Sequence, residues 1–168
     1  MKQVIQYVDP FDFSAIRTVL GAATLFVVLV ALRRPLGLKA VREVALLGVL
    51  QTGAFTALIQ WALVAGGAGK TAVLVYTMPF WVVPMAWFVL GERVRGMQWV
   101  ANAIAGCGLV LVLEPWAMGG SAFSNLLAVA GGVTWAAASV QAKRMRRTHD
   151  FDLLSLTAWQ MLFGAIAL

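Results

Sequence analysis

An uncharged stretch of twenty residues runs from Thr71 to Leu90, with the sequence TAVLVYTMPFWVVPMAWFVL. A helix rises about 1.5 Å per residue, so a stretch of this length crosses the ~30 Å hydrocarbon core of a bilayer. It contains two prolines, Pro79 and Pro84, and is followed at once by the polar motif Gly91-Glu92-Arg93. The stretch therefore predicts a membrane-spanning helix that ends at a polar loop.

The two prolines predict that this helix is bent. Proline has no N–H, so the carbonyl groups of Val75 and Phe80 lose the donors that a regular helix would supply. At membrane depth such a loss is tolerated where the backbone is buried in protein or lines a water-filled cavity. The prolines therefore indicate a polar path beside the helix.

Composition indicates that the rest of the chain is also embedded in a membrane. Of its 168 residues, 61% are hydrophobic and 12% are charged, which is typical of an integral membrane protein. Runs with little or no charge predict an all-α fold with six transmembrane helices, at residues 13–32, 44–65, 71–90, 97–113, 123–142 and 153–168. The short connections leave no room for a soluble domain.

Positive charge is concentrated on one side of these predicted spans. Ten of the thirteen Lys and Arg residues lie in the connections at 33–43, 91–96 and 143–152. Lys and Arg in short loops are retained on the cytoplasmic side. We therefore expect these three connections to be cytoplasmic and the first residue to be outside.

The same residues argue against several other classes of protein. The net charge of +6 comes from few acids and from loop cations, so we expect no nucleic-acid binding. Cys107 is the only cysteine and His149 the only histidine, so the sequence offers no cysteine metal cluster, HExxH pair or Ser/His/Asp set. No two carboxylates share a span, which disfavours acid–base catalysis. We expect no enzymatic activity, no metal and no cofactor.

Polar and aromatic side chains inside the spans are candidates for a solute cavity. Tyr76 belongs to an aromatic stripe with a four-residue repeat, and Thr77 and Trp81 lie alongside it. This stripe either packs against other helices or forms a cavity wall with hydroxyl groups for a substrate. Gln60 of the second span and Trp135 of the fifth complete the predicted cavity set.

Two further expectations concern polar side chains near this set. Gln51 precedes Gln60 by nine residues, which at 3.6 residues per turn places the two amides on opposite faces of one helix. They are therefore not expected to share one cavity. Glu92 is expected to pair with a nearby cation such as Arg95. No embedded carboxylate marks a proton site in the six spans, so the coupling ion stays open.

Weak internal symmetry accompanies this pattern. Shifting the chain by 143 positions gives five identities among seventeen pairs, including Gly21 with Gly164. The first predicted span then corresponds to the sixth, with five helices per period. An odd number of helices reverses the direction of the second unit, as in the inverted repeats of many secondary transporters.

The chain resembles the EamA family of the drug/metabolite transporter superfamily. The most specific stretch is AGGAGKTAVLVYTMPFWVVPMAWFVLGERVRGMQWVANAIAGCGLVLVL at residues 65–113. The segments DPFDFSAIRTVLGAATL and LLAVAGGVTWAAASVQAKR add support. The resemblance implies ten helices in two inverted five-helix repeats around a central cavity in a bacterial inner membrane. It also implies that the protein exports small metabolites, amino acids or drugs by alternating access.

The resemblance assigns roles to individual residues. Pro79 matches the proline of the family's fourth helix, the motif Gly91-Glu92-Arg93 matches its loop, and Trp135 matches the tryptophan of its sixth helix. Pro84 departs from the family pattern, which has an ordinary apolar residue there, and this puts the second half of its span in doubt.

The resemblance also implies that the chain is a fragment holding helices two to seven of ten. Residues 1–115 would form a first repeat without its first helix, and residues 116–168 would open the second repeat. We therefore expect the chain as printed not to transport by itself. The expected partners are the lipid bilayer and a small solute, while substrate, direction and a homodimer stay open. The alternative is a non-transporting membrane scaffold whose aromatic stripe binds a partner helix.

Overall fold

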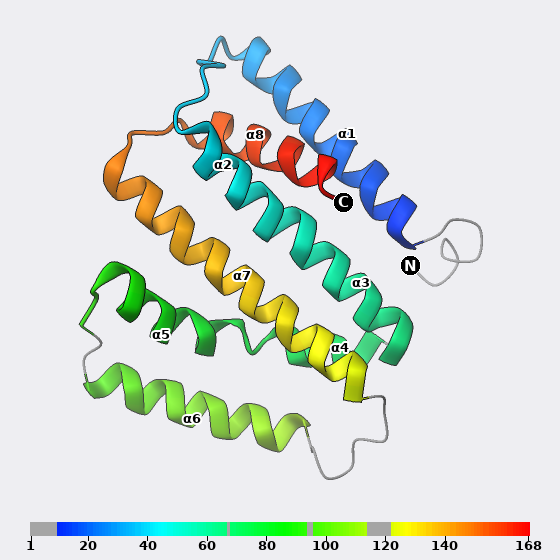
Figure 1. Ribbon diagram of the computed structural model, residues 1–168, viewed down its shortest axis with the longest axis vertical. Coiled ribbons are helices and arrows are strands. Elements are labelled where there is room, and N and C mark those ends of the chain that lie inside the picture. Colours follow the sequence, from blue (N-terminus) through cyan, green and yellow to red (C-terminus); the bar gives the residue numbers. More distant parts are fainter. Residues whose placement is uncertain (1–9, 67, 94–95, 114–121) are drawn as a thin grey trace.

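The computed structural model describes residues 10–66, 68–93, 96–113 and 122–168. Within these ranges all regular structure is helical (Figure 1). In chain order the elements are α1 Pro10–Ala31, α2 Val41–Gly48, the π-helix η1 Val49–Ala54, α3 Phe55–Gly66, α4 Ala68–Val75, α5 Met78–Leu90, α6 Gly96–Leu113, α7 Ala122–Thr148 and α8 Leu153–Ile166. The helical content confirms the all-α class.

Among the described residues, four helical segments are long and apolar enough to cross a membrane. They are Phe11–Ala31, Val41–Gly66, Thr71–Leu90 and Phe123–Thr148. The second combines α2, η1 and α3, and the third combines α4 and α5. These segments match four of the six predicted spans. Helices α6 and α8 coincide with the other two, whose crossing of a membrane stays a prediction.

Helix α7 extends further than the sequence pattern predicts. The apolar run ends at residue 142, yet the helix continues through a basic segment to Thr148. Lys and Arg have high helix propensity, and cations in a last helical turn interact favourably with the helix dipole. Four cations that were expected in a loop, Lys143, Arg144, Arg146 and Arg147, are therefore held on a rigid helix.

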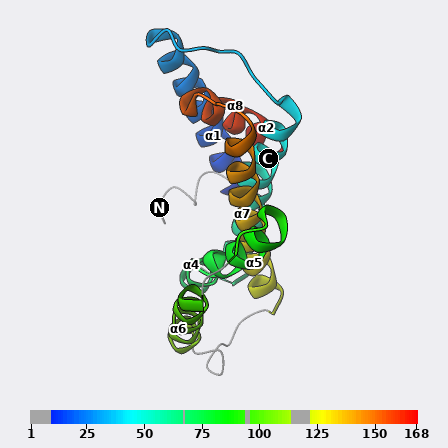
Figure 2. The ribbon, with the colours of Figure 1, turned by 90° about the vertical axis from the view of Figure 1, so that its left-hand side faces the viewer.

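The helices are arranged around α7. Figure 1 shows α7 between the α2–α3 segment and α5, with α6 beyond α5. Helices α8 and α1 lie on the other side of the α2–α3 segment. One buried cluster, which includes Leu47, Met145 and Leu156, joins α2, α7 and α8. A second, which includes Ala62 and Ala128, joins α3, α4 and α7. Viewed from the side, the helices form a narrow body (Figure 2).

Helix α8 packs on the α2–η1 segment through small residues. A Cβ atom on Gly164 would lie 2.8 Å from the carbonyl oxygen of Gly48 and would collide with Thr52. Glycine at membrane depth allows two backbones to approach this closely, which gains van der Waals contact where no hydrophobic force acts between helices. This contact fixes the position of α8 against η1.

Large apolar side chains on the outer faces remain exposed. They include Val27 and Leu20 on α1 and Met97, Ile104 and Leu111 on α6. Exposed apolar surface on this scale marks a site that contacts lipid or another protein. It fits the membrane-embedded protein that composition predicts.

The connection after α1 and the connection before α8 lie at the same end of the helices, which we call the basic end. Arg34, after α1, lies 3.3 Å from the carboxylate of Asp152, before α8. The indole nitrogen of Trp159 donates to the carbonyl oxygen of Leu36 at 3.2 Å. These bonds tie the connection after α1 to the one before α8, as expected if both lie on one side of the bilayer.

Candidate functional site

The predicted bent helix is interrupted at its first proline. Helix α4 ends at Val75 and α5 begins at Met78, with Tyr76 and Thr77 as a turn between them. The amides of Tyr76 and Thr77 each donate to the carbonyl oxygen three residues earlier, at 3.1 Å, as in the tighter 3₁₀ geometry. Pro79 lies in the first turn of α5, where a missing N–H does no harm. The interruption therefore follows from the position of Pro79.

Pro84 has a milder effect, because it lies inside α5 without ending the helix. The second half of the span thus continues to Leu90, where Gly91 closes the helix with a φ of 62°. Glycine adopts this left-handed conformation without steric cost and is the common residue at such a position.

Helix α7 passes close to the interruption. A Cβ atom on Gly132 would lie 3.0 Å from the hydroxyl oxygen of Thr77 and 3.6 Å from the amide nitrogen of Met78. The Thr77 hydroxyl donates to the carbonyl oxygen of Leu74 at 2.7 Å. Gly132 therefore lets the backbone of α7 lie against the exposed turn of the broken helix.

The five predicted cavity residues lie in different places in the structure. Tyr76 and Trp81 are 67% and 38% exposed, Thr77 faces α7 as described, and Trp135 is half-buried on α7. Gln60 donates from its amide nitrogen to the hydroxyl oxygen of Ser14 on α1. Their role in a cavity stays a prediction.

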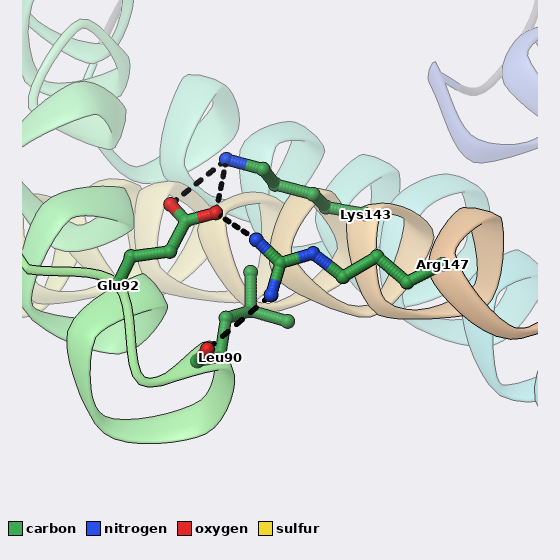
Figure 3. A network of polar contacts seen from close by, with 4 residues as sticks. All are labelled: Leu90, Glu92, Lys143 and Arg147. Atoms are coloured by element: carbon green, nitrogen blue, oxygen red, sulfur yellow. Dashed lines mark hydrogen bonds and ion pairs between the residues drawn. The ribbon is translucent and has the colours of Figure 1, made fainter.

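The motif Gly91-Glu92-Arg93 carries an ion cluster at the basic end (Figure 3). The Lys143 ammonium nitrogen lies 2.6 and 2.8 Å from the two oxygens of Glu92. Arg147 also donates to Glu92, and its second terminal nitrogen donates to the carbonyl oxygen of Leu90 at 3.3 Å. The cluster thus fastens the end of α5 to the end of α7.

The electrostatics of the cluster follow from these contacts. The hydrogen bond from Lys143, together with the charges of Lys143 and Arg147, holds the pKa of Glu92 below its usual value, although partial burial opposes this. The expected partner Arg95 lies outside the described residues. Among the described residues, Glu92 pairs with cations 51 and 55 residues further along the chain.

Two clefts open beside this part of α7. The first, which we call the α5–α7 cleft, has a volume of about 440 Å³ and is lined by Val82, Val83, Ala86, Glu92, Arg93, Gln98, Ser139, Val140 and Lys143. The second, the α7–α8 cleft, has a volume of about 620 Å³ and is lined by Leu47, Gln51, Ser139, Ala142, Lys143, Arg146, Leu153, Leu156, Thr157 and Gln160. Ser139 and Lys143 line both. Neither cleft is lined by the five predicted cavity residues.

An amide pair spans one wall of the α7–α8 cleft. The Gln160 nitrogen on α8 donates to the Gln51 oxygen on η1 at 3.0 Å. Gln51 and Gln60 thus bond to different helices, as their opposite placement on one helix predicts. Among the described residues, no group of three or more His, Cys, Asp or Glu side chains could hold a metal ion.

The predicted cavity set contains none of the residues that line these clefts, and three of them, Lys143, Arg146 and Gln160, illustrate the reason. Lys143 and Arg146 were expected in a loop, and Gln160 was not among the candidate residues. The available signal was the basic segment directly after an apolar helical run, since such residues extend a helix readily. For Gln160 the signal was a polar amide within an apolar span.

Comparison with known proteins decides the family. The family model of EamA-like transporters matches residues 1–114. The chain belongs to the EamA-like transporter family. Among its relatives, the uncharacterized transporter YoaV of Bacillus subtilis is 25% identical over the whole of this chain and 59% of its own length. The uncharacterized transporter YvbV of the same organism is 28% identical over 99% of the chain and 55% of its own length.

A riboflavin transporter of Rhizobium johnstonii is 32% identical over 55% of this EamA-like chain and 30% of its own length. No solved structure matches the chain. The chain spans just over half the length of the two Bacillus relatives. The chain is therefore a membrane protein of a transporter family. The activity of the whole protein is a separate proposal.

Proposed function

We propose that this EamA-like chain forms part of the solute pathway of a membrane transporter that exports small metabolites, amino acids or drugs by alternating access. Membership of the EamA-like transporter family carries this proposal. The proposed location is a bacterial inner membrane, crossed several times. No feature of the described residues favours the scaffold alternative.

The proposal places the pathway along α7. Interrupted helices at membrane depth recur at the substrate sites of secondary transporters, because the freed backbone groups can bind solute or ions. The α4–α5 interruption lies against Gly132 of α7, and two clefts flank the same helix nearer the basic end. In this proposal Tyr76, Thr77 and Trp81 line the path near the interruption.

The proposal also keeps the arrangement of repeats expected from the sequence. Residues 1–115 would belong to one five-helix repeat and residues 116–168 to the next, which runs in the opposite direction. The match to the family model ends at residue 114, beside this proposed boundary. The described helices would then be helices two to seven of ten.

A flux assay tests the proposal. The protein expressed from its complete reading frame would be reconstituted into proteoliposomes and challenged with amino acids, cationic drugs and riboflavin. Riboflavin belongs in the panel because one relative is named a riboflavin transporter. We expect protein-dependent flux of at least one solute, and no flux across the panel would count against transport.

Two tryptophans of α5 provide a matched pair of variants. Trp81→Ala removes a predicted cavity side chain, whereas Trp87→Ala removes the same side chain from another face of the same helix. Both are partly exposed, at 38% and 50%. Loss of one aromatic contact to the solute should lower flux about tenfold for Trp81→Ala. Equal effects of the two variants would argue that Trp81 does not line the path.

A further inference from the structure

The α7–α8 cleft combines positive charge with an apolar wall. Its polar lining consists of Gln51, Ser139, Lys143, Arg146, Thr157 and Gln160, and its remaining lining residues are three leucines and an alanine. Among the described residues, none of the ten that line the cleft is an acid. A concave surface of this kind suits an amphipathic molecule with a negatively charged group.

The surroundings of the cleft add to its positive potential. Lys143 and Arg146 lie in the last turns of α7, and α8 begins at the cleft with Leu153. The N-terminus of a helix carries partial positive charge. Two carboxylates in this part of the molecule are already engaged: Asp152 accepts from the first turn of α8 and pairs with Arg34, and Glu92 pairs with Lys143 on the side of the α5–α7 cleft.

The deeper part of the cleft supplies neutral polar groups. Gln160 and Gln51 use one nitrogen and one oxygen for their mutual hydrogen bond. An amide that uses one of these atoms still has the other, so the pair retains donors and an acceptor for a ligand. Gln51 lies in η1, and single π-helical turns within α-helices are frequent at functional sites.

We propose that the α7–α8 cleft binds the anionic oxygen group of a small amphipathic molecule, a carboxylate or a phosphate. Arg146 and Lys143 supply the charge, the glutamine pair supplies hydrogen bonds, and Leu153 and Ala142 contact the hydrocarbon part. If the bound molecule is a transported solute, the anion site rests on the proposed function and names the chemical class of the substrate. The same chemistry is offered by the headgroup of an anionic lipid, and the experiment separates these two sources.

Arg146 gives the sharper test, because Lys143 also holds Glu92. Arg146→Gln removes one charge from the cleft and keeps a polar side chain. Arg144→Gln makes the same change on an exposed residue of α7 that lines neither cleft. Both side chains are exposed, so both variants should fold, which circular dichroism checks.

The probes are benzoate, benzyl alcohol and benzylammonium, which share a ring and differ in charge. Binding is measured by calorimetry on the protein in phosphatidylcholine nanodiscs. We expect benzoate to bind more tightly than the other two. Its affinity should fall about tenfold in Arg146→Gln, since a hydrogen bond to a charged group is lost, and should stay unchanged in Arg144→Gln. Equal affinity of the three probes, or equal effects of the two variants, would overturn the proposal.

A second arm adds phosphatidylglycerol to the nanodiscs. If this lipid weakens benzoate binding by the unmodified protein but not by Arg146→Gln, the cleft binds an anionic lipid headgroup. If it has no effect, the cleft binds the anion of a solute. These measurements need no flux, so selective benzoate binding without transport would count only against the proposed function. Transport without charge selectivity in benzoate binding would count only against the anion site.

Discussion

Substituting Gly164 by alanine should loosen the contact between α8 and the α2–η1 segment. The added Cβ would collide with Thr52 and lie 2.8 Å from the carbonyl oxygen of Gly48. Ordinary contacts between non-bonded heavy atoms are about 3.5 Å or longer. The Gly48 oxygen belongs to backbone and cannot rotate away, so α8 has to move outward by roughly 0.7 Å or more.

Two opposing terms set the magnitude. Alanine is favoured over glycine within a helix by about 1 kcal/mol. Overpacking a tight contact costs about 1–3 kcal/mol. Gly108 of α6 isolates the first term, because a Cβ there would meet nothing within 4 Å. The difference in unfolding free energy between Gly164→Ala and Gly108→Ala therefore equals the steric cost, about 1–3 kcal/mol.

The assay is equilibrium unfolding in mixed micelles with increasing dodecyl sulfate, followed by the loss of helical circular dichroism. Gly108→Ala should be as stable as the unmodified protein or slightly more stable. Gly164→Ala should unfold at a lower dodecyl sulfate fraction than Gly108→Ala. If the two variants unfold together, the close packing of α8 on η1 described above is wrong.

The remaining predictions concern the ion cluster and the buried core. Because the pKa of Glu92 is lowered in the folded protein, its contribution to stability is present above its ordinary value of 4.5 and is lost as the pH falls through the folded pKa. The melting temperature of Glu92→Gln should therefore lie below that of the unmodified protein at pH 7, and the difference should disappear in strong acid; a pH-independent difference would contradict the ion-pair explanation. Met145→Ala should lower the unfolding free energy by about 2–5 kcal/mol, because it leaves a cavity in the cluster with Leu47 and Leu156 where Met145 is 0% exposed. Met97→Ala, at a side chain 80% exposed, is the matched control and should change it little, as unfolding followed by circular dichroism would show.

Much of the helical layout could be predicted from the sequence. The run lengths located four membrane-length segments within a few residues at their amino-terminal ends, because the thickness of a bilayer fixes how many apolar residues must be consecutive. The prolines predicted a bend in the third span, and the structure has an interruption between Val75 and Met78 beside Pro79, since a missing N–H is a property of the residue itself. The C-terminal boundary of α7 was predicted too early, at residue 142 and not at Thr148. Hydropathy marks where a helix leaves the membrane, and a helix can continue beyond that point.

Residue contacts across helices could not be predicted in the same way. The sequence did not predict the pairing of Glu92 with Lys143 and Arg147 of α7, which lie far from it along the chain. The pair Gln51–Gln160 joins positions 109 residues apart. Such contacts form only when two helices have a particular rotation about their axes and a particular register along each other. The sequence of one helix specifies neither of these.

The sequence by itself thus determined that this is a helical membrane protein, that prolines disturb one of its spans and which transporter family it resembles. These properties follow from hydropathy, charge and proline chemistry, which act residue by residue along the chain. Only the tertiary structure decided which side chains line the two clefts. The rotation of α8 depends on the approach of Gly164 to Gly48, and one turn of π-helix changes the direction of every side chain that follows it.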